Sequence, residues 1–180
     1  KTTVKTRIIS EGKHQLRVDE EDTHPIKTEN QFINKVDSLL ENTSIIILQD
    51  YNKGVLTKKI IRTLISKAKE RGIPTIVDPK KDNFLEYQGC DIFKPNLKEI
   101  KEGINLEFDE SKDEELQKAT SLLKEKLNAK AILLTLSGKG ICINSEEGFV
   151  HTPAYGESVI DVSGAGDTVI SVSSLLLSAG

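Results

Sequence analysis

Short apolar segments alternate with segments of helical periodicity between residues 44 and 136 of this chain. The apolar runs at 44–48, 75–77, 91–93 and 131–136 have the length and composition of buried strands. Between the first two runs, apolar residues recur at helical spacing at Ile60, Ile61, Leu64, Ile65 and Ala68. Strands that alternate with helices predict right-handed βαβ units. The chain is therefore expected to have an α/β fold, with a mostly parallel central sheet and helices on both faces.

Capping residues mark the ends of the predicted helices. Thr57 can cap the helix described above, and the Gly- and Pro-containing segment 72–74 stops it. Ser111 and Glu114 have capping-box spacing, which predicts a helix that runs to residue 127. Further helices are expected over residues 31–42 and 96–102, and a last one contains the helix-like apolar run 169–177.

The first 22 residues differ from the rest of the chain. Two β-rich segments flank the turn at 11–13, which predicts a hairpin that forms a small unit of its own over residues 1–22. A polar connector then leads into the α/β core, which is expected over residues 23–180. A second hairpin is expected over residues 141–150.

Composition excludes several classes of protein. The net charge is only −3, and Lys and Arg are scattered, so neither a nucleic-acid partner nor a membrane surface is expected. No run approaches the roughly 18 apolar residues of a membrane span, and the N-terminus lacks the apolar region of a signal peptide. We therefore expect a soluble, cytoplasmic protein. The chain contains no Met and ends directly after an apolar helix, so we expect it to be a piece of a longer protein.

The cysteines and histidines give no sign of a metal site. Cys90 and Cys142 are too few for a disulfide framework, and neither has the spacing of a Cys/His ligand set. The chain has three histidines, and they share no ligand spacing.

The most informative motif is a Gly-rich segment that reads Asp161-Val162-Ser163-Gly164-Ala165-Gly166-Asp167-Thr168. It follows a β-branched run over 158–162, a predicted strand, and precedes an apolar helical segment. Glycine permits positive φ, so backbone N–H groups can converge on an anion, and a helix start adds its own free N–H groups. Gly164, Ala165 and Gly166 are therefore a candidate anion hole, and Asp167 is a candidate general base for a hydroxyl group. The alternative is a tight helix start in which Asp167 only complements the dipole.

Other polar motifs also follow predicted strands, where ligands bind in open α/β sheets. They are the segments Asp50-Tyr51-Asn52-Lys53-Gly54, Asp78-Pro79-Lys80, Pro95-Asn96-Leu97-Lys98-Glu99 and Ser137-Gly138-Lys139-Gly140. These loops bring acids, amides, lysines and glycines, which suit phosphate and Mg²⁺, to one edge of the sheet.

Each loop also has a purely structural interpretation. Asn96 and Glu99 have capping-box spacing, and Asp78 precedes a proline, which favours an extended chain. The remaining candidates can be solvated lysines or turn glycines: Lys53, Lys80, Gly138 and Gly140. The shared position at one edge favours the functional interpretation.

These motifs resemble those of the ribokinase-like (PfkB) carbohydrate kinases. Segment 161–168 looks like the family's second signature, segment 96–99 matches its Asn-x-x-Glu motif, and segment 134–140 is similar to its nucleotide-binding strand and loop. More narrowly, segments 6–10, 15–19, 50–54 and 78–80 look like parts of the kinase domain of bacterial heptose 7-phosphate kinases. In many bacteria that domain is fused to an ADP-heptose synthase domain. The resemblance implies a ribokinase-like sandwich with a small β lid, incomplete at both ends.

The resemblance also implies an activity, the ATP-dependent phosphorylation of the anomeric hydroxyl of D-glycero-β-D-manno-heptose 7-phosphate. In that activity Asp167 accepts the hydroxyl proton, and Gly164 to Gly166 stabilise the transferred phosphoryl group. Asn96 and Glu99 order Mg²⁺ through water. The implied nucleotide-binding residues are Asn96, Leu97, Lys98, Glu99, Thr135, Ser137, Gly138 and Gly140. The implied sugar-side residues are Arg7, Arg17, Lys53, Asp78 and Lys80.

Alternatives remain in two classes. Another PfkB-type sugar kinase would share the nucleotide motifs, and a non-catalytic nucleotide- or sugar-phosphate-binding module would not need Asp167. A dinucleotide-binding domain is disfavoured because no Gly-x-Gly-x-x-Gly follows the first strand. No Walker lysine motif is present either. The resemblance leaves open a homodimer that forms through the lid.

Overall fold

The computed structural model of the chain describes residues 2–11, 13–155 and 164–179. The strands are β1 (Val4–Ser10), β2 (Lys13–Glu20), β3 (Ile46–Gln49), β4 (Thr75–Asp78), β5 (Ile92–Phe93), β6 (Ala131–Thr135), β7 (Ile141–Ser145) and β8 (Gly148–Thr152). The α-helices are α1 (Glu29–Asp37), α2 (Lys58–Glu70), α3 (Leu97–Ile104), α4 (Asp113–Leu127) and α5 (Ala165–Ala179). The predicted strand over 158–162 lies outside the described residues.

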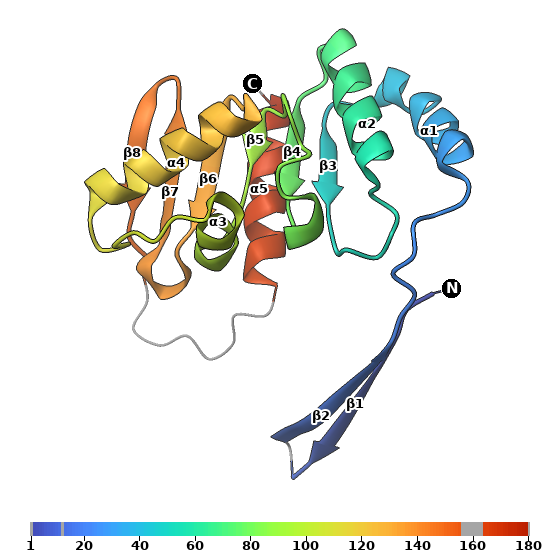
Figure 1. Ribbon diagram of the computed structural model, residues 1–180, viewed down its shortest axis with the longest axis horizontal. Helices are drawn as coiled ribbons and strands as arrows, with labels where there is room; N and C mark the ends of the chain where they lie inside the picture. The colour runs from blue at the N-terminus through green and yellow to red at the C-terminus, as the bar shows by residue number, and fades with distance from the viewer. Residues whose placement is uncertain (1, 12, 156–163, 180) are drawn as a thin grey trace.

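The central sheet has the strand order β3-β4-β5-β6-β7-β8 (Figure 1). The first four strands pair in parallel, and β7 and β8 then add as an antiparallel hairpin. The mostly parallel sheet predicted from the alternating pattern is therefore confirmed. The second predicted hairpin is confirmed as well.

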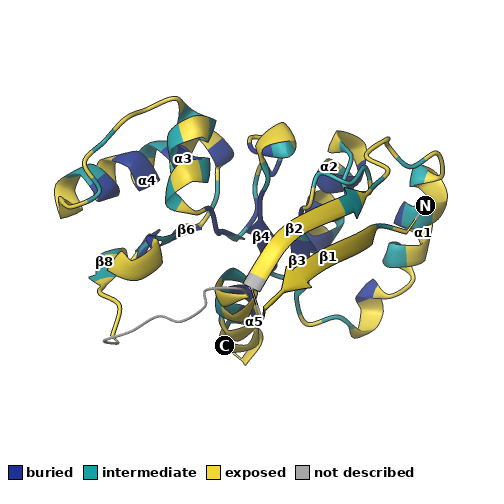
Figure 2. Ribbon diagram, turned by 90° about the horizontal axis from the view of Figure 1, so that it is seen from below, coloured by how far each residue is buried: buried dark blue, intermediate teal, exposed yellow. Residues whose placement is uncertain are grey.

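Helices cover both faces of this sheet, as predicted, but they divide unequally. Helices α2 to α4 lie on one face, α1 packs against α2 at the β3 end of the sheet, and α5 lies on the other face, where it contacts β4 (Figures 1 and 2). The division follows from topology. Successive parallel strands are added in one direction, and crossovers of one hand then place their helices on the same face.

The main core lies between the sheet and helices α2 to α4. Its largest fully buried side chains include Ile60 and Ile61 of α2, Leu116 and Leu123 of α4, and Phe93 of β5. Because these residues recur at helical spacing or occur in continuous strand runs, the same pattern that predicted the elements also predicted which side chains are buried.

Two predicted helix boundaries are wrong. The helix expected over 31–42 ends at Asp37, where Ser38 donates to the carbonyl of Lys35 at 2.7 Å, and a 3-10 turn over Leu40–Asn42 follows. The capping box expected at Ser111 does not form, because Ser111 bonds Asp109 through both its hydroxyl and its N–H. Helix α4 therefore begins at Asp113 without a side-chain cap.

The cap predicted at Thr57 is confirmed, since its hydroxyl oxygen accepts from the N–H of Ile60 at 3.3 Å. Helix α2 is thereby fixed next to the loop that follows β3. In that loop Gly54 has φ +76°, and a Cβ at this position would overlap the carbonyl oxygen of His24. The N–H of Ile26 donates to the carbonyl of Gly54 at 2.9 Å. The connector after the hairpin is therefore packed directly against this loop.

The predicted N-terminal hairpin is confirmed as the antiparallel pair β1 and β2, and it projects away from the body of the protein (Figure 1). Its cross-strand register sorts the side chains onto two faces. One face carries Val4, Ile8, Leu16 and Val18, together with Thr6 and, at its end, Glu20. The other carries Lys5, Arg7, Arg17 and Asp19. The hairpin is thus mostly apolar on one side and mostly charged on the other.

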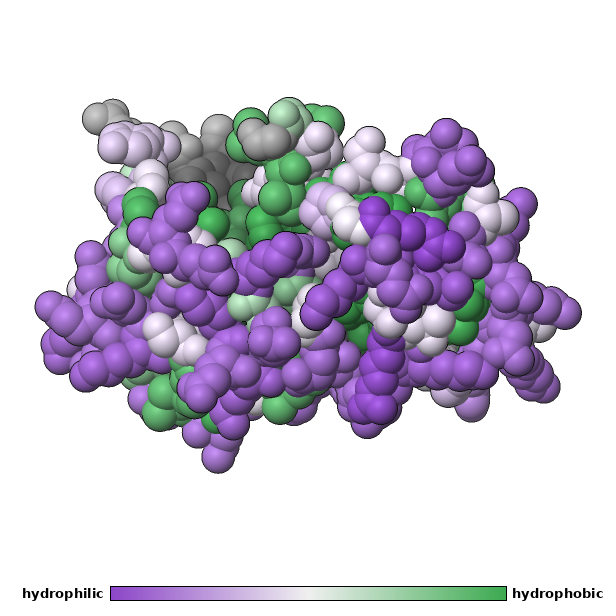
Figure 3. Space-filling model, turned by 90° about the horizontal axis from the view of Figure 1, so that it is seen from above, coloured by the Kyte–Doolittle hydropathy of each residue, from purple (hydrophilic) through white to green (hydrophobic). Residues whose placement is uncertain are grey.

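The surface opposite the hairpin is mostly hydrophilic, and apolar side chains gather near the C-terminus (Figure 3). Leu175 and Leu176 of α5 are each 69% exposed. Among the residues that the structure describes, no helix combines the length and the apolar character needed to cross a bilayer.

Candidate functional site

The carboxyl ends of the parallel strands β3 to β6 form one edge of the sheet, here called the site edge. Helix α5 begins at the same edge, and the hairpin projects beyond it (Figure 1). The loops that the sequence singled out therefore meet at the place where open α/β sheets bind ligands.

The start of α5 is a glycine turn. Gly164 has φ +78°, a conformation that favours glycine, and its carbonyl accepts from the N–H and the hydroxyl of Thr168 at 2.8 and 3.0 Å. The N–H groups of Ala165, Gly166 and Asp167 occupy the first helical turn, where an α-helix supplies no acceptor. Asp167 is exposed beside them. The other residues of this motif, 161–163, lie outside the described residues.

A buried lysine lies beside the glycine turn. The Nζ of Lys94, directly after β5, is 3.1 Å from Oδ1 of Asp78, and both side chains are over 90% buried. Oδ2 of Asp78 accepts from Nε2 of Gln49 at 2.6 Å. A Cβ placed on Gly166 would lie 3.6 Å from the same Nζ. Asp78 was predicted to face the sugar, and in the structure it binds Lys94 and Gln49 beneath the glycine turn.

Asn96 and Glu99 form the capping box of α3. The N–H of Glu99 donates to Oδ1 of Asn96, and the N–H of Asn96 donates to Oε2 of Glu99, each at 2.9 Å. Oε1 of Glu99 accepts from Nζ of Lys80 at 2.6 Å. Glu99 therefore joins two predicted loops of the site edge as well as capping a helix.

The surroundings of Lys80 stabilise its charged form. Burial opposes the charged form, but the hydrogen bond to Glu99 and the charges of Glu99, Asp78 and Asp50 outweigh it and raise the pKa of Lys80. The lysine therefore stays charged at neutral pH.

The loop after β6 lies next to the capping box. Asn96 and Thr135 form a parallel bridge, and the N–H of Thr135 donates to the carbonyl of Pro95 at 3.1 Å. Ser137 and Gly138 are exposed, and Gly140 has φ +103° and packs against β8 so closely that a Cβ would overlap a backbone oxygen. The two predicted nucleotide-binding segments are thus adjacent. In the first of them, Leu97 is half-buried and Lys98 is exposed.

An ion-paired glutamate tethers the loop after β6. Glu110 accepts from Nζ of Lys139 at 3.2 Å and from Nζ of Lys101 at 2.9 Å. The hydrogen bond from Lys101, together with a backbone hydrogen bond and the bond from Lys139, lowers the pKa of Glu110 to about 2.

Behind the edge of β3, a buried carboxylate is held by three donors. Asp50 accepts from the hydroxyl of Tyr87 at 2.7 Å, from Nδ2 of Asn83 at 3.1 Å and from the N–H of Asn52 at 2.8 Å. Tyr87 is fully buried, and this burial raises the pKa of its hydroxyl. These hydrogen bonds to Asp50 hold the loop after β3 in place.

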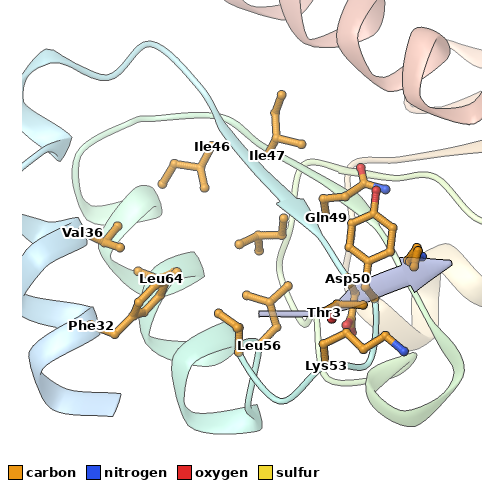
Figure 4. Close-up of a pocket in the computed structure, with 14 residues that line it drawn as sticks. Thr3, Phe32, Val36, Ile46, Ile47, Gln49, Asp50, Lys53, Leu56 and Leu64 are labelled. Carbon is orange, nitrogen blue, oxygen red and sulfur yellow. The ribbon is translucent and has the colours of Figure 1, made fainter. Parts of the chain in front are cut away.

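A cavity of about 710 Å³ opens beside β3 (Figure 4). Phe32, Val36 and Leu64 line its apolar end, and Gln49, Asp50 and Lys53 gather at its polar end next to Thr3 of the hairpin segment. The polar end borders the site edge, whereas the apolar end extends away from it. Only the polar end is therefore placed to belong to a polar ligand site.

The structure does not bring the hairpin arginines to the site edge. Arg7 and Arg17 are direct cross-strand partners, and both are exposed. Arg17 pairs with Asp19 at 3.1 Å. Lys53 pairs with Glu21, at the end of the hairpin, rather than with another residue of the edge.

Sequence reasoning missed Lys94, Gln49 and Tyr87 as parts of this constellation. Lys94 gave a usable signal, because it is a charged residue directly after an apolar strand run, in the same position as the predicted loops. Tyr87 gave none, since it reaches Asp50 from a segment without a motif. Among the described residues, no group of three or more His, Cys, Asp or Glu side chains is arranged to hold a metal.

Known proteins share both the sequence and the fold. The family model for pfkB family carbohydrate kinases matches residues 1–180. A Campylobacter jejuni serotype O:6 protein named bifunctional protein HldE is 40% identical over 180 residues, which are 100% of this chain and 38% of that protein. A Rhodopseudomonas palustris protein of the same name is 40% identical over 184 residues, covering 99% of this chain and 37% of its own. The chain thus spans less than two fifths of these relatives.

Solved structures extend the likeness in fold. Phosphofructokinase-2 from Escherichia coli, in complex with potassium, has a TM-score of 0.79 at 20% identity, covering 98% of this chain and 57% of its own. Arabidopsis thaliana ribokinase, complexed with ribose and ATP, has a TM-score of 0.72 at 20% identity, covering 99% and 56%. The ribokinase-like fold predicted from the motifs is confirmed.

Proposed function

Because the chain belongs to the pfkB family of carbohydrate kinases, we propose that its parent protein transfers the γ-phosphoryl group of ATP to a sugar hydroxyl. The proposed acceptor is the anomeric hydroxyl of D-glycero-β-D-manno-heptose 7-phosphate, and the product is the 1,7-bisphosphate used for the ADP-heptose of lipopolysaccharide. ATP supply places this reaction in the cytoplasm. The observation that carries the proposal is the glycine turn at the start of α5, with Asp167 exposed in its first helical turn.

Asp167 accepts the proton of the sugar hydroxyl while the oxygen of that hydroxyl attacks the γ-phosphorus. The bond between that phosphorus and the β,γ-bridging oxygen breaks, and ADP leaves. N–H groups of Gly164, Ala165 and Gly166 stabilise the charge on the transferred group. Such transfer depends mostly on positioning and electrostatic stabilisation, which backbone donors at a helix start supply.

On the nucleotide side we propose that Ser137, Gly138, Gly140 and Thr135 contact ATP together with the capping box of α3. Mg²⁺ would neutralise charge on the ATP phosphates. Both carboxylate oxygens of Glu99 and the amide oxygen of Asn96 already accept hydrogen bonds. These oxygen atoms are therefore better suited to contact waters bound to Mg²⁺ than to bind the ion directly, in line with its tendency to retain water.

On the sugar side, we propose that Arg7 and Arg17 bind the phosphate that the acceptor already carries. Like charges directly opposite each other destabilise a strand pair, and an anion between two guanidinium groups would relieve that repulsion. Lys5 lies on the same face of the hairpin and also lines the cavity beside β3, which supports an inward orientation of this face. Lys53, Asp78 and Lys80 complete the proposed sugar side, with Asp78 acting from beneath.

The hairpin over residues 1–22 would then be a lid on the core formed by residues 23–180. Its apolar face carries Val4, Ile8, Leu16 and Val18, each about half exposed (49% to 53%). We propose that a second copy of the chain covers this face in a homodimer. An Ile8→Lys variant should shift the sedimentation coefficient of the intact protein to that of a monomer, and an unchanged dimer would contradict the proposal.

The decisive experiment is a substrate panel with the intact protein, Mg²⁺ and ATP. Heptose 7-phosphate should be consumed with the highest kcat/KM, and Asp167→Asn should lower kcat by at least ~10²-fold, since a general base contributes on the order of 10² to 10⁴. ATP affinity should stay nearly unchanged. Preference for ribose or fructose would assign another pfkB-type sugar kinase. Binding of ATP without turnover of any sugar would assign a non-catalytic module.

A further inference from the structure

Lys94 is a buried cation at the centre of the site edge. Only 3% of the residue is exposed, and its backbone N–H donates to the carbonyl of Val77 at 2.8 Å, which fixes its position between β4 and β5. An ammonium group is costly to bury unless other groups compensate its charge. The position of this lysine therefore calls for a physical explanation.

Asp78 provides part of that explanation. Its Oδ1 lies 3.1 Å from Nζ of Lys94, and Gln49 binds its other oxygen. Stability alone is a weak reason for the pair, since well-packed apolar residues often replace a buried ion pair without loss. An ammonium also carries three N–H donors, so it can hold Asp78 and a second acceptor at once.

The second direction in which Lys94 points is the glycine turn. A Cβ on Gly166 would lie 3.6 Å from its Nζ, so the absence of a side chain there leaves the ammonium against the backbone of the turn. Backbone N–H groups at a helix start attract an anion through partial charges alone. Lys94 adds a full positive charge at the same place.

We propose that Lys94 is a catalytic residue of phosphoryl transfer, whose ammonium stabilises the γ-phosphoryl group in the turn formed by Gly164, Ala165 and Gly166. Asp78 acts as a positioning residue that holds this ammonium. The hydroxyl proton goes to Asp167, so Lys94 takes no part in the proton transfer. The inference rests on the proposed phosphoryl transfer but not on the identity of the sugar. It also explains how the site works without a Walker lysine.

The test separates this role from a purely structural ion pair. Lys94→Met alone leaves the Asp78 carboxylate buried without its ammonium partner and can unfold the protein, so the comparison is made in an Asp78→Asn background. The Lys94→Met/Asp78→Asn double variant of the intact protein should melt at or above the temperature of Asp78→Asn. Its kcat should nevertheless be ~10² to 10³-fold lower than that of Asp78→Asn, the range expected for loss of one stabilising donor. Lys94→Arg should retain part of the activity, since it keeps the charge.

A binding measurement makes the result independent of the sugar. ADP with fluoroaluminate, a mimic of the transferred phosphoryl group, should raise the melting temperature of Asp78→Asn more than ADP alone. The double variant should lose this increment but keep the shift that ADP alone produces. If the double variant keeps the fluoroaluminate increment and the kcat of Asp78→Asn, Lys94 is only the ion-pair partner of Asp78. Loss of the increment in a protein that turns over no heptose 7-phosphate would retain this inference and refute the proposed substrate.

Discussion

Glu99→Gln separates the capping role of Glu99 from its proposed role in ordering Mg²⁺. Glutamine keeps one acceptor oxygen, so it can still cap α3 at the N–H of Asn96, as in other capping boxes. It then presents an amide N–H₂ group to Lys80, where Oε1 of Glu99 accepts a bond of 2.6 Å. The substitution therefore removes the ion pair and retains the cap.

The loss of stability follows from the exposure of this pair. The Lys80 side chain is 37% exposed and that of Glu99 14%, so solvent screening reduces the ion pair to about 1 kcal/mol or less. For a domain of this size, 1 kcal/mol shifts the melting temperature by roughly 2–4 °C. The Mg²⁺ concentration for half-maximal activity should rise by about 10-fold or more, the usual effect of losing an outer-shell partner of a metal.

Glu86→Gln is the matched control. Glu86 has a similarly shielded side chain, 16% exposed, and pairs with Lys58 and Arg62 at 2.7 and 2.6 Å, but it is not among the proposed nucleotide- or metal-binding residues. The melting temperature of Glu86→Gln should fall by a similar amount as that of Glu99→Gln, with no change in Mg²⁺ dependence. Titration of Mg²⁺ at saturating ATP and sugar measures both variants. Equal Mg²⁺ dependence in Glu99→Gln and the wild type would refute the metal role and leave Glu99 as a cap with an ion pair.

Three further outcomes are expected. Arg7→Ala and Arg17→Ala should each raise KM for heptose 7-phosphate by about 10-fold or more, as for a charged hydrogen bond of roughly 1.5–3 kcal/mol, with KM for ATP unchanged; unchanged sugar KM in both variants would remove the phosphate role. Glu110 has a pKa lowered to about 2, so the stability that its charged form contributes is present above pH 4.5 and is lost as the pH falls toward 2. In Glu110→Gln the urea midpoint should therefore depend less on pH between 4.5 and 2 than in the wild type, and an equal pH dependence in both proteins would contradict this. Gly54→Ala should lower the melting temperature, because a Cβ would overlap the carbonyl of His24 and φ is positive there; calorimetry showing no loss would refute this packing.

The sequence predicted the sheet and its helices well because burial leaves a direct trace in residue order. A strand covered on both faces needs a continuous apolar run, and a helix with one buried face needs apolar residues at helical spacing. The loops of the site edge were found for the same reason, since parallel strands bring their carboxyl ends together. Thr57 and Asn96 were identified as caps because a capping bond spans only three residues.

Sequence reasoning failed for two reasons. Either a second local hydrogen bond competed with the predicted one, or the contact joined segments that are far apart in the chain. Ser111 has capping-box spacing, but Asp109 two residues earlier binds its hydroxyl and its N–H, so the cap is lost. The pairing of Lys53 with Glu21 and the approach of Lys94 to Gly166 join segments far apart in the chain. No spacing rule reports such contacts, because they depend on how whole elements pack.

The strand order has a consequence for how the protein assembles during synthesis. Strands β3 to β8 lie in the sheet in the order in which the ribosome releases them, so each strand can add to an edge that already exists. Among the described strands β3 to β8, none has to insert between two others, and loop closure is needed only between neighbours, which favours rapid growth of this part of the sheet. Helix α5, on the opposite face, emerges after all of these strands. The glycine turn is therefore synthesised only after the described strands β3 to β8.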